Sequence, residues 1–377
     1  MSKTVVVGLS GGVDSSVAAV LLKEQGYNVI GLFMRNWDSS TNNDVLGNPT
    51  LNDEVCSQEV DYQDAEKVAK KIGIPIYRVD FIKEYWDNVF TYFLEEYKKG
   101  RTPNPDILCN KYIKFDAFLE HAKQFKADYI AMGHFAQVKT IDGVTSMYRG
   151  NDDNKDQTYF LSQLTEEQLS KTLFPVGHLN KKQVRELAIK FDLPTKDKKD
   201  STGICFIGER DFEQFLSNYL PSQKGNMVTQ TGEIISQHSG LMYYTIGQRK
   251  GLGIGGSNEF GNEPWFVIGK DLSKNELIVG QGFHHEVLYS DSCLIDDVNL
   301  INHDSFDNEL VYTAKFRYRQ KDTEVRIKHV DDDLLITFLE DVRAVTPGQA
   351  CVIYQGDRCL GGGFIKEVYK NKKIRKY

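Results

Sequence analysis

A loop rich in glycine and serine, GLSGGVDSS at Gly8–Ser16, is the first segment whose residue types could bind phosphate. It does not fit the Walker pattern G-x-x-x-x-G-K-[ST], because the sixth position from Gly8 is Val13 and no lysine follows. Nor does it fit the dinucleotide pattern G-x-G-x-x-G, which Ser10 interrupts. The loop must therefore hold its ligand in another way.

The chemistry of this loop still suits an anion. Gly11 and Gly12 let the backbone approach closely. A helix expected to begin near Asp14 would direct free N–H groups and its positive dipole end at the site. Asp14 could cap that helix or orient a magnesium ion. Hydroxyl donors for phosphate oxygens are present at Ser10, Ser15 and Ser16.

Directly after an apolar strand, the loop resembles that of the N-type ATP pyrophosphatases. Enzymes of that superfamily cleave ATP between the α and β phosphates to adenylate a substrate oxygen, and a nucleophile then displaces AMP. The resemblance leaves the nucleophile open.

Two cysteines have unusual neighbours. Cys109 lies in the proline-containing segment RTPNPDILCNKYIKF, with Asp106 three residues before it where a helix is expected to begin. A thiol near a helix N-terminus has its thiolate stabilised, and a proline-rich loop is a poor place to bury a side chain. Cys205 lies in the segment DSTGICFIGER. The alternative to a reactive thiol at this position is a cysteine that packs in the core as a small apolar side chain. An activated oxygen and two reactive thiols would suit sulfur transfer, with one thiol carrying a persulfide and the other releasing sulfide.

The remaining cysteines and histidines are less informative. The six cysteines contain no C-x-x-C pair. Cys56 stays undecided, and His134, after Gly133 at a strand end, is a site candidate. His284 and His285 are expected at the surface rather than around a metal. Packing is expected for the cysteines in strand patterns, Cys293, Cys351 and Cys359.

Strands and helices alternate over the first half of the chain. Apolar runs at residues 4–9, 28–34, 74–81 and 128–135 are typical of buried strands, with helical spacing between them. This order predicts an α/β fold with a doubly wound parallel sheet. Ligands bind at the carboxyl ends of such strands, where the loop, Met34 and Gly133–His134 would all lie.

The residue pattern of the sequence changes after Pro221. Glycine becomes frequent, and a small β-rich module is expected before about Glu286. Short strands with turn signals follow, which favours a β-barrel or sandwich. Residues 38–58, rich in Asn and Asp, are expected to form a mobile surface insertion.

The 377 residues carry a formal net charge of −7, which argues against a generally basic nucleic-acid coat protein but allows a local basic patch. No stretch approaches the roughly 18 apolar residues of a membrane helix. A soluble, cytoplasmic protein with mostly reduced cysteines is expected.

Several segments together resemble the tRNA-specific 2-thiouridylases: GLSGGVDSS, GRTPNPDILCNKYIKF, GHFA, KDQTYFL, DSTGICFIGER, YTIGQRKGLGIGG and TPGQA. The match runs from Val7 to at least Gly363 in the family's order. The resemblance implies an N-type ATP pyrophosphatase domain at residues 1–210, a central β-rich module at 211–285 and a tRNA-contacting β-barrel at 286–377.

By this resemblance, the reaction makes 2-thiouridine at the wobble uridine of tRNAs for Lys, Glu and Gln. ATP with Mg²⁺ would adenylate O2 of the uridine and release pyrophosphate. No separate metal site and no tightly bound cofactor are implied. The implied ATP-binding residues are Gly8, Leu9, Ser10, Gly11, Gly12, Val13, Asp14, Ser15, Met34 and Gly133.

The resemblance also assigns the sulfur chemistry. Cys205 would receive sulfur as a persulfide from a cysteine desulfurase or a relay protein. Cys109 would release it as sulfide and end in a disulfide with Cys205, while Asp106 acts as acid–base. Asn104, Pro105 and Asp106 would cradle the flipped-out base. Further tRNA contacts are implied for His134, Lys155, Asp156, Gln157, Arg317, Tyr318 and Gln349.

Small departures and rival functions remain. Phe135 and Thr158 stand where the family usually has tyrosine and serine, and the 38–58 insertion is longer than usual. A ligase or amidotransferase of the same superfamily, using an amine or ammonia, would need no cysteine pair. A non-catalytic tRNA-binding or sulfur-carrier protein would not need the intact loop beside Asp106 and Cys109. Because the two cysteines are far apart in sequence, a loop is hypothesised to order on tRNA binding before they meet.

Overall fold

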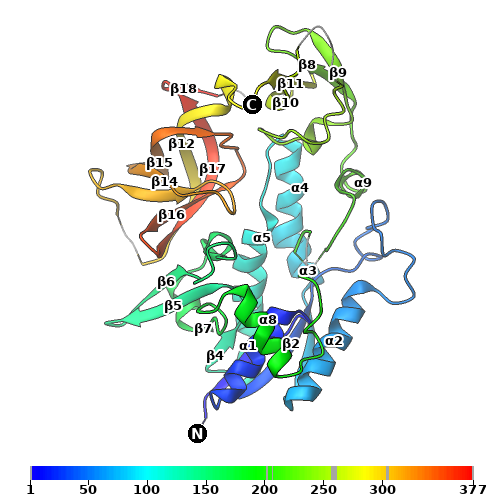
Figure 1. Ribbon diagram of the computed structural model, residues 1–377, viewed down its shortest axis with the longest axis vertical. Helices are drawn as coiled ribbons and strands as arrows, with labels where there is room; N and C mark the ends of the chain where they lie inside the picture. The colour runs from blue at the N-terminus through cyan, green and yellow to red at the C-terminus, as the bar shows by residue number, and fades with distance from the viewer. Residues whose placement is uncertain (1, 201–202, 206, 256–260, 303–304, 376–377) are drawn as a thin grey trace.

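A computed structural model describes residues 2–200, 203–205, 207–255, 261–302 and 305–375. The α/β domain lies at the bottom of Figure 1, and the C-terminal barrel and the central β-rich module lie above it on opposite sides. Three residues of the DSTGICFIGER segment, Ser201, Thr202 and Phe206, lie outside the described residues.

A parallel sheet of order β3-β2-β1-β4-β7 organises the α/β domain. Its central strand carries Val5, Val6 and Val7, all fully buried, as expected for a strand covered on both faces. The predicted α/β fold class is confirmed. The strands are β1 (Thr4–Gly8), β2 (Asn28–Arg35), β3 (Ile76–Asp80), β4 (Tyr129–Ala131) and β7 (Thr172–Leu173).

Helices cover both faces of this sheet. Val5, Val7 and Phe33 pack against α2 on one face of the sheet. On the other face, Val6 and Leu32 share a core with the helix that carries Cys109. The helices on the first face are α1 (Val13–Glu24) and α2 (Ser57–Ile72), with α8 (Lys181–Lys190) packed on α1. Those between β3 and β4 are α3 (Ile82–Tyr85), η1 (Trp86–Phe90), α4 (Thr91–Lys98), α5 (Pro105–Leu108), η2 (Cys109–Ala117), α6 (Phe118–Ala122) and η3 (Lys123–Phe125).

The insertion at residues 38–58 is only partly a surface feature. Asp44 is fully buried, where its carboxylate pairs with Arg210 at 2.8 Å and accepts the indole N–H of Trp37 at 3.0 Å. The hydroxyl of Tyr219 also donates to the carbonyl of Asn42 at 2.9 Å. The expectation of a mobile surface insertion is therefore wrong for this first part, which a buried ion pair fixes to the core.

The central module is a small sheet of order β10-β11-β8-β9, reached through α9 (Phe212–Ser217). Alternating apolar residues such as Phe266, Ile268, Leu277 and Val279 form its own core. Its elements are β8 (Gly225–Val228), β9 (Ile234–His238), η5 (Leu241–Tyr243), β10 (Trp265–Asp271) and β11 (Glu276–Gln281).

The C-terminal sheet closes into a barrel, because β12 pairs with both β15 and β17. This selects the barrel from the two architectures that the sequence left open. Its elements are η6 (Glu286–Leu288), β12 (Tyr289–Leu300), β13 (Tyr312–Lys315), β14 (Thr323–Val330), β15 (Asp333–Arg343), β16 (Ala350–Gln355), β17 (Arg358–Lys370) and β18 (Lys373–Ile374).

A hairpin from the first half of the chain joins this barrel sheet. Strand β6 pairs with β17, so that Tyr148 lies opposite Arg358. The barrel residues Val352, Tyr354 and Phe364 belong to the same core cluster as the α/β domain. The two domains therefore share one continuous core. The elements around this junction are β5 (Ala136–Ile141), β6 (Val144–Arg149), η4 (Thr158–Leu161) and α7 (Glu166–Ser170).

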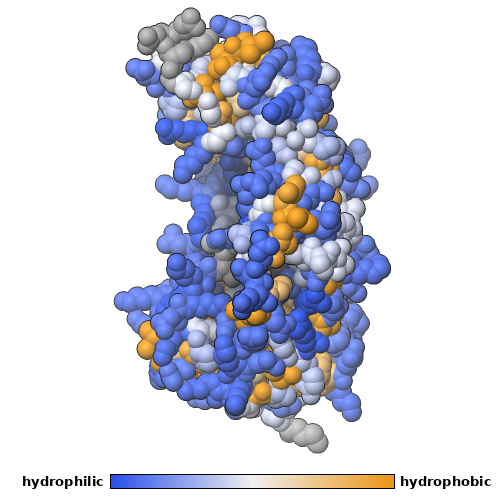
Figure 2. All heavy atoms as spheres, turned by 90° about the vertical axis from the view of Figure 1, so that its right-hand side faces the viewer, coloured by the Kyte–Doolittle hydropathy of each residue, from blue (hydrophilic) through white to orange (hydrophobic). Residues whose placement is uncertain are grey.

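The face drawn in Figure 2 is mostly hydrophilic. Figure 2 shows isolated apolar patches on one face and a hollow between the lower and upper parts of the molecule. Exposed apolar side chains of the 38–58 insertion include Val45, Leu46 and Leu51. Among the described residues, no helix has the length and apolar character needed to cross a membrane.

Candidate active site

Glycine is required where the backbone packs closely around the loop at the start of α1. Gly11 has φ +72°, and a Cβ there would lie 2.1 Å from the carbonyl oxygen of Asp61. A Cβ on Gly133 would lie 2.8 Å from the backbone nitrogen of Ser15. Gly12 caps α1 without a side-chain hydrogen bond, so the first N–H groups of the helix remain for an anion.

Two hydroxyl groups of the loop, those of Ser15 and Ser16, bond to the loop backbone, whereas Ser10 is exposed. Ser15 and Ser16 donate to the carbonyl of Gly12, at 3.1 and 2.7 Å. Ser16 is fully buried and accepts a hydrogen bond from Thr195 at 3.0 Å. The expectation that the Ser16 hydroxyl faces phosphate is therefore wrong. Ser10 is exposed and lies 3.1 Å from the Ser15 hydroxyl.

Asp14 does not cap α1, because Gly12 occupies that position. Its carboxylate instead pairs with Lys181 at 2.6 Å. Burial raises the pKa of Asp14, against the lowering effect of Lys181. Lys181 also contacts Asp200 at 2.8 Å, as does Lys155. These ion pairs place cations beside the start of α1, where a polyphosphate would need them.

Two buried polar side chains lie at the ends of neighbouring strands. Both amide atoms of Asn36, directly after β2, lack hydrogen-bond partners in the described part of the chain. The same holds for Nδ1 of His134, which follows β4 and lies between the rings of Phe115 and Phe174. Such groups are normally satisfied, so they fit a polar ligand at this edge of the sheet.

The methionine predicted to bind ATP lies at the same edge. A Cβ on Gly8 would meet Sδ of Met132 at 2.6 Å and Cε of Met34 at 3.5 Å. Met34 therefore flanks the start of the loop through its side chain. Both methionines are buried in the core cluster that also contains Cys109.

Cys109 occupies a different position from the one expected. It follows α5 directly and begins the π-helix η2, one turn beyond the helix start at Pro105. Its side chain is fully buried. Burial raises the pKa of the Cys109 thiol well above its ordinary value. The expectation of an unburied cysteine with a stabilised thiolate is therefore wrong for Cys109.

Cys205 is the thiol of the pair whose pKa is lowered. Its sulfur accepts a hydrogen bond from Cys109 at 3.6 Å. This hydrogen bond, aided by the charge of Lys114, lowers the pKa of Cys205. Both cysteines are free thiols. Because the sulfurs are already in contact, the hypothesis of a loop that must order before they meet is not needed.

The backbone of Cys205 is tied to helices α3 and α5 by two hydrogen bonds. Its N–H donates to the carboxylate of Asp106 at 3.2 Å, and its carbonyl accepts the buried hydroxyl of Tyr85 at 2.9 Å. Burial raises the pKa of Asp106 against the opposing charge of Lys114. A carboxyl group with a raised pKa can exchange a proton closer to neutral pH.

Lys114 is a site residue that the sequence analysis missed. Its side chain hydrogen-bonds Cys205. Burial works to lower the pKa of Lys114, but the charges of Cys205, Cys109 and Asp106 outweigh it and raise the pKa. The only signal in the sequence is its position five residues after Cys109, which becomes meaningful once the helix is known to be of the π type.

The loop before Asp106 is held by the other two domains. Gln349 of the barrel donates to the carbonyls of Thr102 and Pro103, at 2.7 and 3.3 Å. Lys270 of the central module donates to the carbonyl of Gly100 at 2.9 Å. Gln349, predicted to contact tRNA, therefore also fixes the loop that leads into Asn104 and Pro105.

The other predicted tRNA contacts have partners within the protein. Asp156 is buried, where its carboxylate accepts hydrogen bonds from Thr158, and the side chain of Gln157 accepts the N–H of Phe135. Arg317 and Tyr318 follow β13: Arg317 donates to the carbonyls of Ile246 and Ala344, and Tyr318 packs on Phe160. None of these contacts tests tRNA binding.

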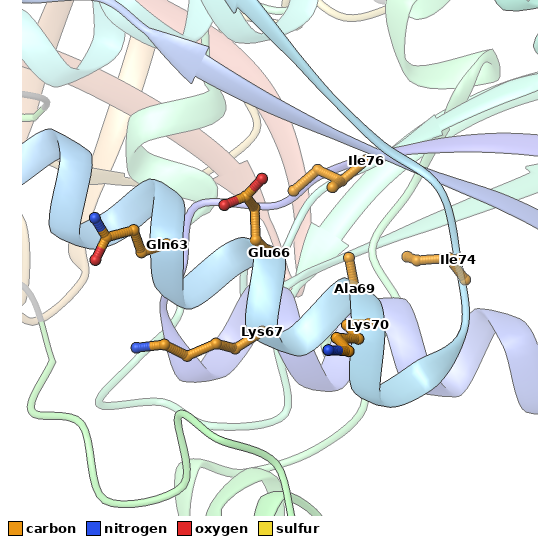
Figure 3. Close-up of a pocket in the computed structure, with 7 residues that line it drawn as sticks. All are labelled: Gln63, Glu66, Lys67, Ala69, Lys70, Ile74 and Ile76. Atoms are coloured by element: carbon orange, nitrogen blue, oxygen red, sulfur yellow. The ribbon is translucent and has the colours of Figure 1, made fainter.

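We also searched the described residues for a metal site and for another pocket that contains predicted site residues. Among the described residues, no group of three His, Cys, Asp or Glu side chains could hold a metal ion. An open groove of about 520 Å³ lies between α2 and β3, lined by Gln63, Glu66, Lys67, Ala69, Lys70, Ile74 and Ile76 (Figure 3). It lies on α2, which packs on the sheet face opposite the Cys109 helix, and contains no predicted site residue.

Three family matches follow the three domains. Residues 3–209 match the tRNA methyl transferase HUP domain, residues 213–281 the tRNA methyl transferase PRC-barrel domain, and residues 290–365 the aminomethyltransferase beta-barrel domain. Together with the parallel sheet, these matches define a HUP-domain protein of the tRNA-modifying class.

Two full-length relatives make the assignment specific. The tRNA-specific 2-thiouridylase MnmA of Acholeplasma laidlawii is 57% identical over 378 residues, covering 100% of both chains. That of Staphylococcus carnosus is 59% identical over 368 residues, covering 97% of this chain and 96% of its own. The chain therefore belongs to the tRNA-specific 2-thiouridylase family and is an enzyme.

A solved structure of a 4-thiouridine synthetase–RNA complex with bound ATP is a distant match. It is 16% identical, with a TM-score of 0.36, covering 55% of this chain and 46% of that chain. A likeness this weak carries no argument about the site.

Proposed function

We propose that the protein converts the wobble uridine of tRNAs for Lys, Glu and Gln to 2-thiouridine in the cytoplasm. The observation that carries the proposal is the contact between the Cys109 and Cys205 sulfurs, 3.6 Å apart, beside Asp106. A pair of thiols with opposite pKa shifts suits a sulfur relay better than it suits amide formation.

In the first step, O2 of the uridine attacks the α-phosphate of ATP, and pyrophosphate leaves. The open N–H groups of α1 and the cations Lys155 and Lys181 support binding of the phosphates. Mg²⁺ bound with the ATP would neutralise phosphate charge, and Asp14 is the nearby carboxylate that could orient it. The predicted residues Gly8–Ser15, Met34 and Gly133 surround this start of α1.

In the second step, Cys205 carries sulfur as a persulfide received from a cysteine desulfurase or a relay protein. The Cys109 sulfur, losing its proton to Asp106, attacks the inner sulfur of Cys205. A Cys109–Cys205 disulfide forms as hydrosulfide leaves. Hydrosulfide then attacks C2 of the adenylated uridine and AMP departs. A dithiol reductant must restore both thiols before the next cycle.

The tRNA must present its target base outside the anticodon stack. We assign the pocket for this base to Asn104, Pro105 and Asp106, which begin α5 beside both thiols. The side chain of Asn104 hydrogen-bonds the Tyr159 hydroxyl, which supports a fixed position. Outer contacts are assigned to His134, Lys155, Asp156, Gln157, Arg317, Tyr318 and Gln349.

An unmodified glutamate tRNA transcript tests the proposal. The enzyme is incubated with ATP, Mg²⁺ and a desulfurase supplied with cysteine, and the RNA is run on a mercury-containing gel that retards thiolated RNA. Retardation is expected with the wild type and is lost without ATP, in Cys109→Ser and in Cys205→Ser. Pyrophosphate release without retardation would overturn the thiolation step and favour an amine-using ligase.

A further inference from the structure

The π-helix η2 places a lysine on the face that carries the first cysteine. Its closing hydrogen bond runs from the N–H of Phe118 to the carbonyl of Ile113, a separation of five residues. Such bonds bring positions five apart onto one face. In an α-helix of 3.6 residues per turn, Cys109 and Lys114 would point about 140° apart. The local widening of the helix therefore puts the Lys114 ammonium beside both thiols.

The contacts around this ammonium are unequal. Lys114 hydrogen-bonds Cys205, and the negative charge of Asp106 also acts on the ammonium group. Cys109 donates its own proton toward Cys205, and burial raises the pKa of Cys109, which favours its protonated form. The negative charge of Asp106 acts to raise the pKa of Cys205, against both donors. Two donors, Cys109 and Lys114, therefore point at the sulfur of Cys205 and lower its pKa.

The remaining titratable neighbours do not supply a competing charge. Burial, with the charge of Lys114, lowers the pKa of His134 well below its ordinary value, so this imidazole is neutral. Burial raises the pKa of Tyr85, whose hydroxyl donates to the carbonyl of Cys205 rather than to the sulfur. Lys114, on η2, is a cation that contacts the sulfur of Cys205.

We propose that Lys114 is a positioning residue that keeps the sulfur of Cys205 anionic and ready to accept an incoming sulfur atom. The Cys205 thiolate attacks the outer sulfur of the donor persulfide, a new S–S bond forms as the donor's S–S bond breaks, and the donor leaves as a thiolate. No outside oxidant is required. The same ammonium then stabilises the terminal sulfur anion of the Cys205 persulfide. This role deepens the proposed function and rests on it.

The test measures the charge of Cys205 directly, without tRNA, ATP or sulfur donor. The folded protein is treated with iodoacetamide over a range of pH, and alkylation of the tryptic peptide at residues 200–210 is followed by mass spectrometry. Lys114→Met is expected to shift the midpoint for Cys205 to higher pH and to slow its alkylation at pH 7 severalfold. Lys114→Arg, which keeps the charge, is expected to restore the wild-type midpoint.

Two controls keep the result specific. Cys56, exposed at the start of α2, is alkylated in the same sample and is expected to keep its profile in all variants. Lys111→Met removes a neighbouring lysine of η2, one that donates to Gln163, and is expected to leave Cys205 unchanged. Lys114→Gln supplies a second neutral variant, with the same shift expected.

An unchanged Cys205 profile in either folded neutral variant would overturn the proposal. An equal shift in Lys111→Met would also overturn it, because the cause would then be loss of helix packing rather than loss of charge at Lys114. Since no substrate is present, a failed Lys114 test leaves the thiolation assay standing. A failed thiolation assay likewise leaves the thiol titration readable.

Discussion

Cys109 and Cys205 touch each other, yet the protein holds them in different ways. Cys109 lies on a continuous helix, is fully buried, and keeps its proton because burial raises its pKa. Cys205 lies in an irregular segment, is partly exposed, and has a lowered pKa because Cys109 and Lys114 donate to its sulfur. One thiol is buried with a raised pKa, whereas the other is partly exposed with a lowered pKa.

This difference matches a division of labour between the two thiols. An accessible thiolate can meet a protein donor, since the thiolate is the nucleophile in sulfur exchange. A buried thiol is protected from the same donor and reacts only when a nearby base takes its proton. The surroundings of each cysteine therefore agree with the order of events that we propose.

The largest expected loss of thiolation activity follows substitution of Asp106, which lies next to both cysteines. Asp106 lies one helical turn before Cys109 and accepts the N–H of Cys205. Asp106→Asn keeps an acceptor but cannot take a proton, so we expect kcat for thiolation to fall by about 10²–10⁴-fold. Near wild-type turnover on the mercury gel would show that Cys109 needs no base at this position.

A substitution in the barrel should disturb the loop that leads to Asp106 and Cys109 without disturbing the segment around Cys205. Gly348 has φ +88°, and a Cβ there would lie 3.0 Å from Cβ of Arg101. Gly348→Ala is expected to lower stability by about 1–3 kcal/mol and to slow thiolation by displacing the loop before Asp106. Gly356→Ala is the matched control, because Gly356 has φ +58° with no atom within 4 Å. Equal thiolation rates in both variants would contradict the link to the barrel.

On the Cys205 side, Tyr85→Phe removes the hydroxyl that donates to the carbonyl of Cys205. A lost hydrogen bond to a buried carbonyl costs about 1 kcal/mol, and we expect a small fall in melting temperature with a severalfold loss of thiolation. Tyr219→Phe, which removes a similar bond to the carbonyl of Asn42 in the 38–58 insertion, should lower stability without that loss. If both variants keep full activity, the position of Cys205 does not depend on Tyr85.

The smallest effect concerns the hydrogen bond between the thiols. Cys109→Ala removes the donor that lowers the pKa of Cys205, so the pKa should rise and less thiolate should be present at pH 7. Alkylation of Cys205 should then begin at higher pH, whereas Cys109→Ser, which keeps a donor, should retain the wild-type profile. A Cys109→Ala profile shifted to lower pH would reverse the assigned direction of the bond.

The sequence was sufficient for the features carried by local patterns. Apolar runs predicted the parallel strands, and the Gly8–Ser16 loop and both cysteine segments were recognisable because their residue types are adjacent in the chain. Lys114 could not be found in this way, because its role depends on the π-helical register of η2. The burial of Cys109 likewise depends on side chains such as Tyr85 and Phe115, which only the tertiary fold brings around it.

Long-range pairs were equally invisible. Asp44 and Arg210 are 166 residues apart, and each alone reads as a surface charge. Their buried ion pair fixes the first part of an insertion that its composition marks as solvent-exposed. The pairing of β6 with β17 could not be anticipated either, because hairpin strands carry no signal for the sheet that they will join.

The hold of the barrel on the loop before Asp106 has a consequence for how the protein is made. Gln349 and Thr102 are 247 residues apart, and the ribosome delivers the chain from its N-terminus. The Gly8–Ser16 loop at the start of α1 can therefore fold long before Gln349 has been synthesised. The loop before Asp106 gains its contact with Gln349 only after the barrel has emerged, so an unfinished protein has the parts of the proposed ATP site without the assembled pocket that we propose for the target base.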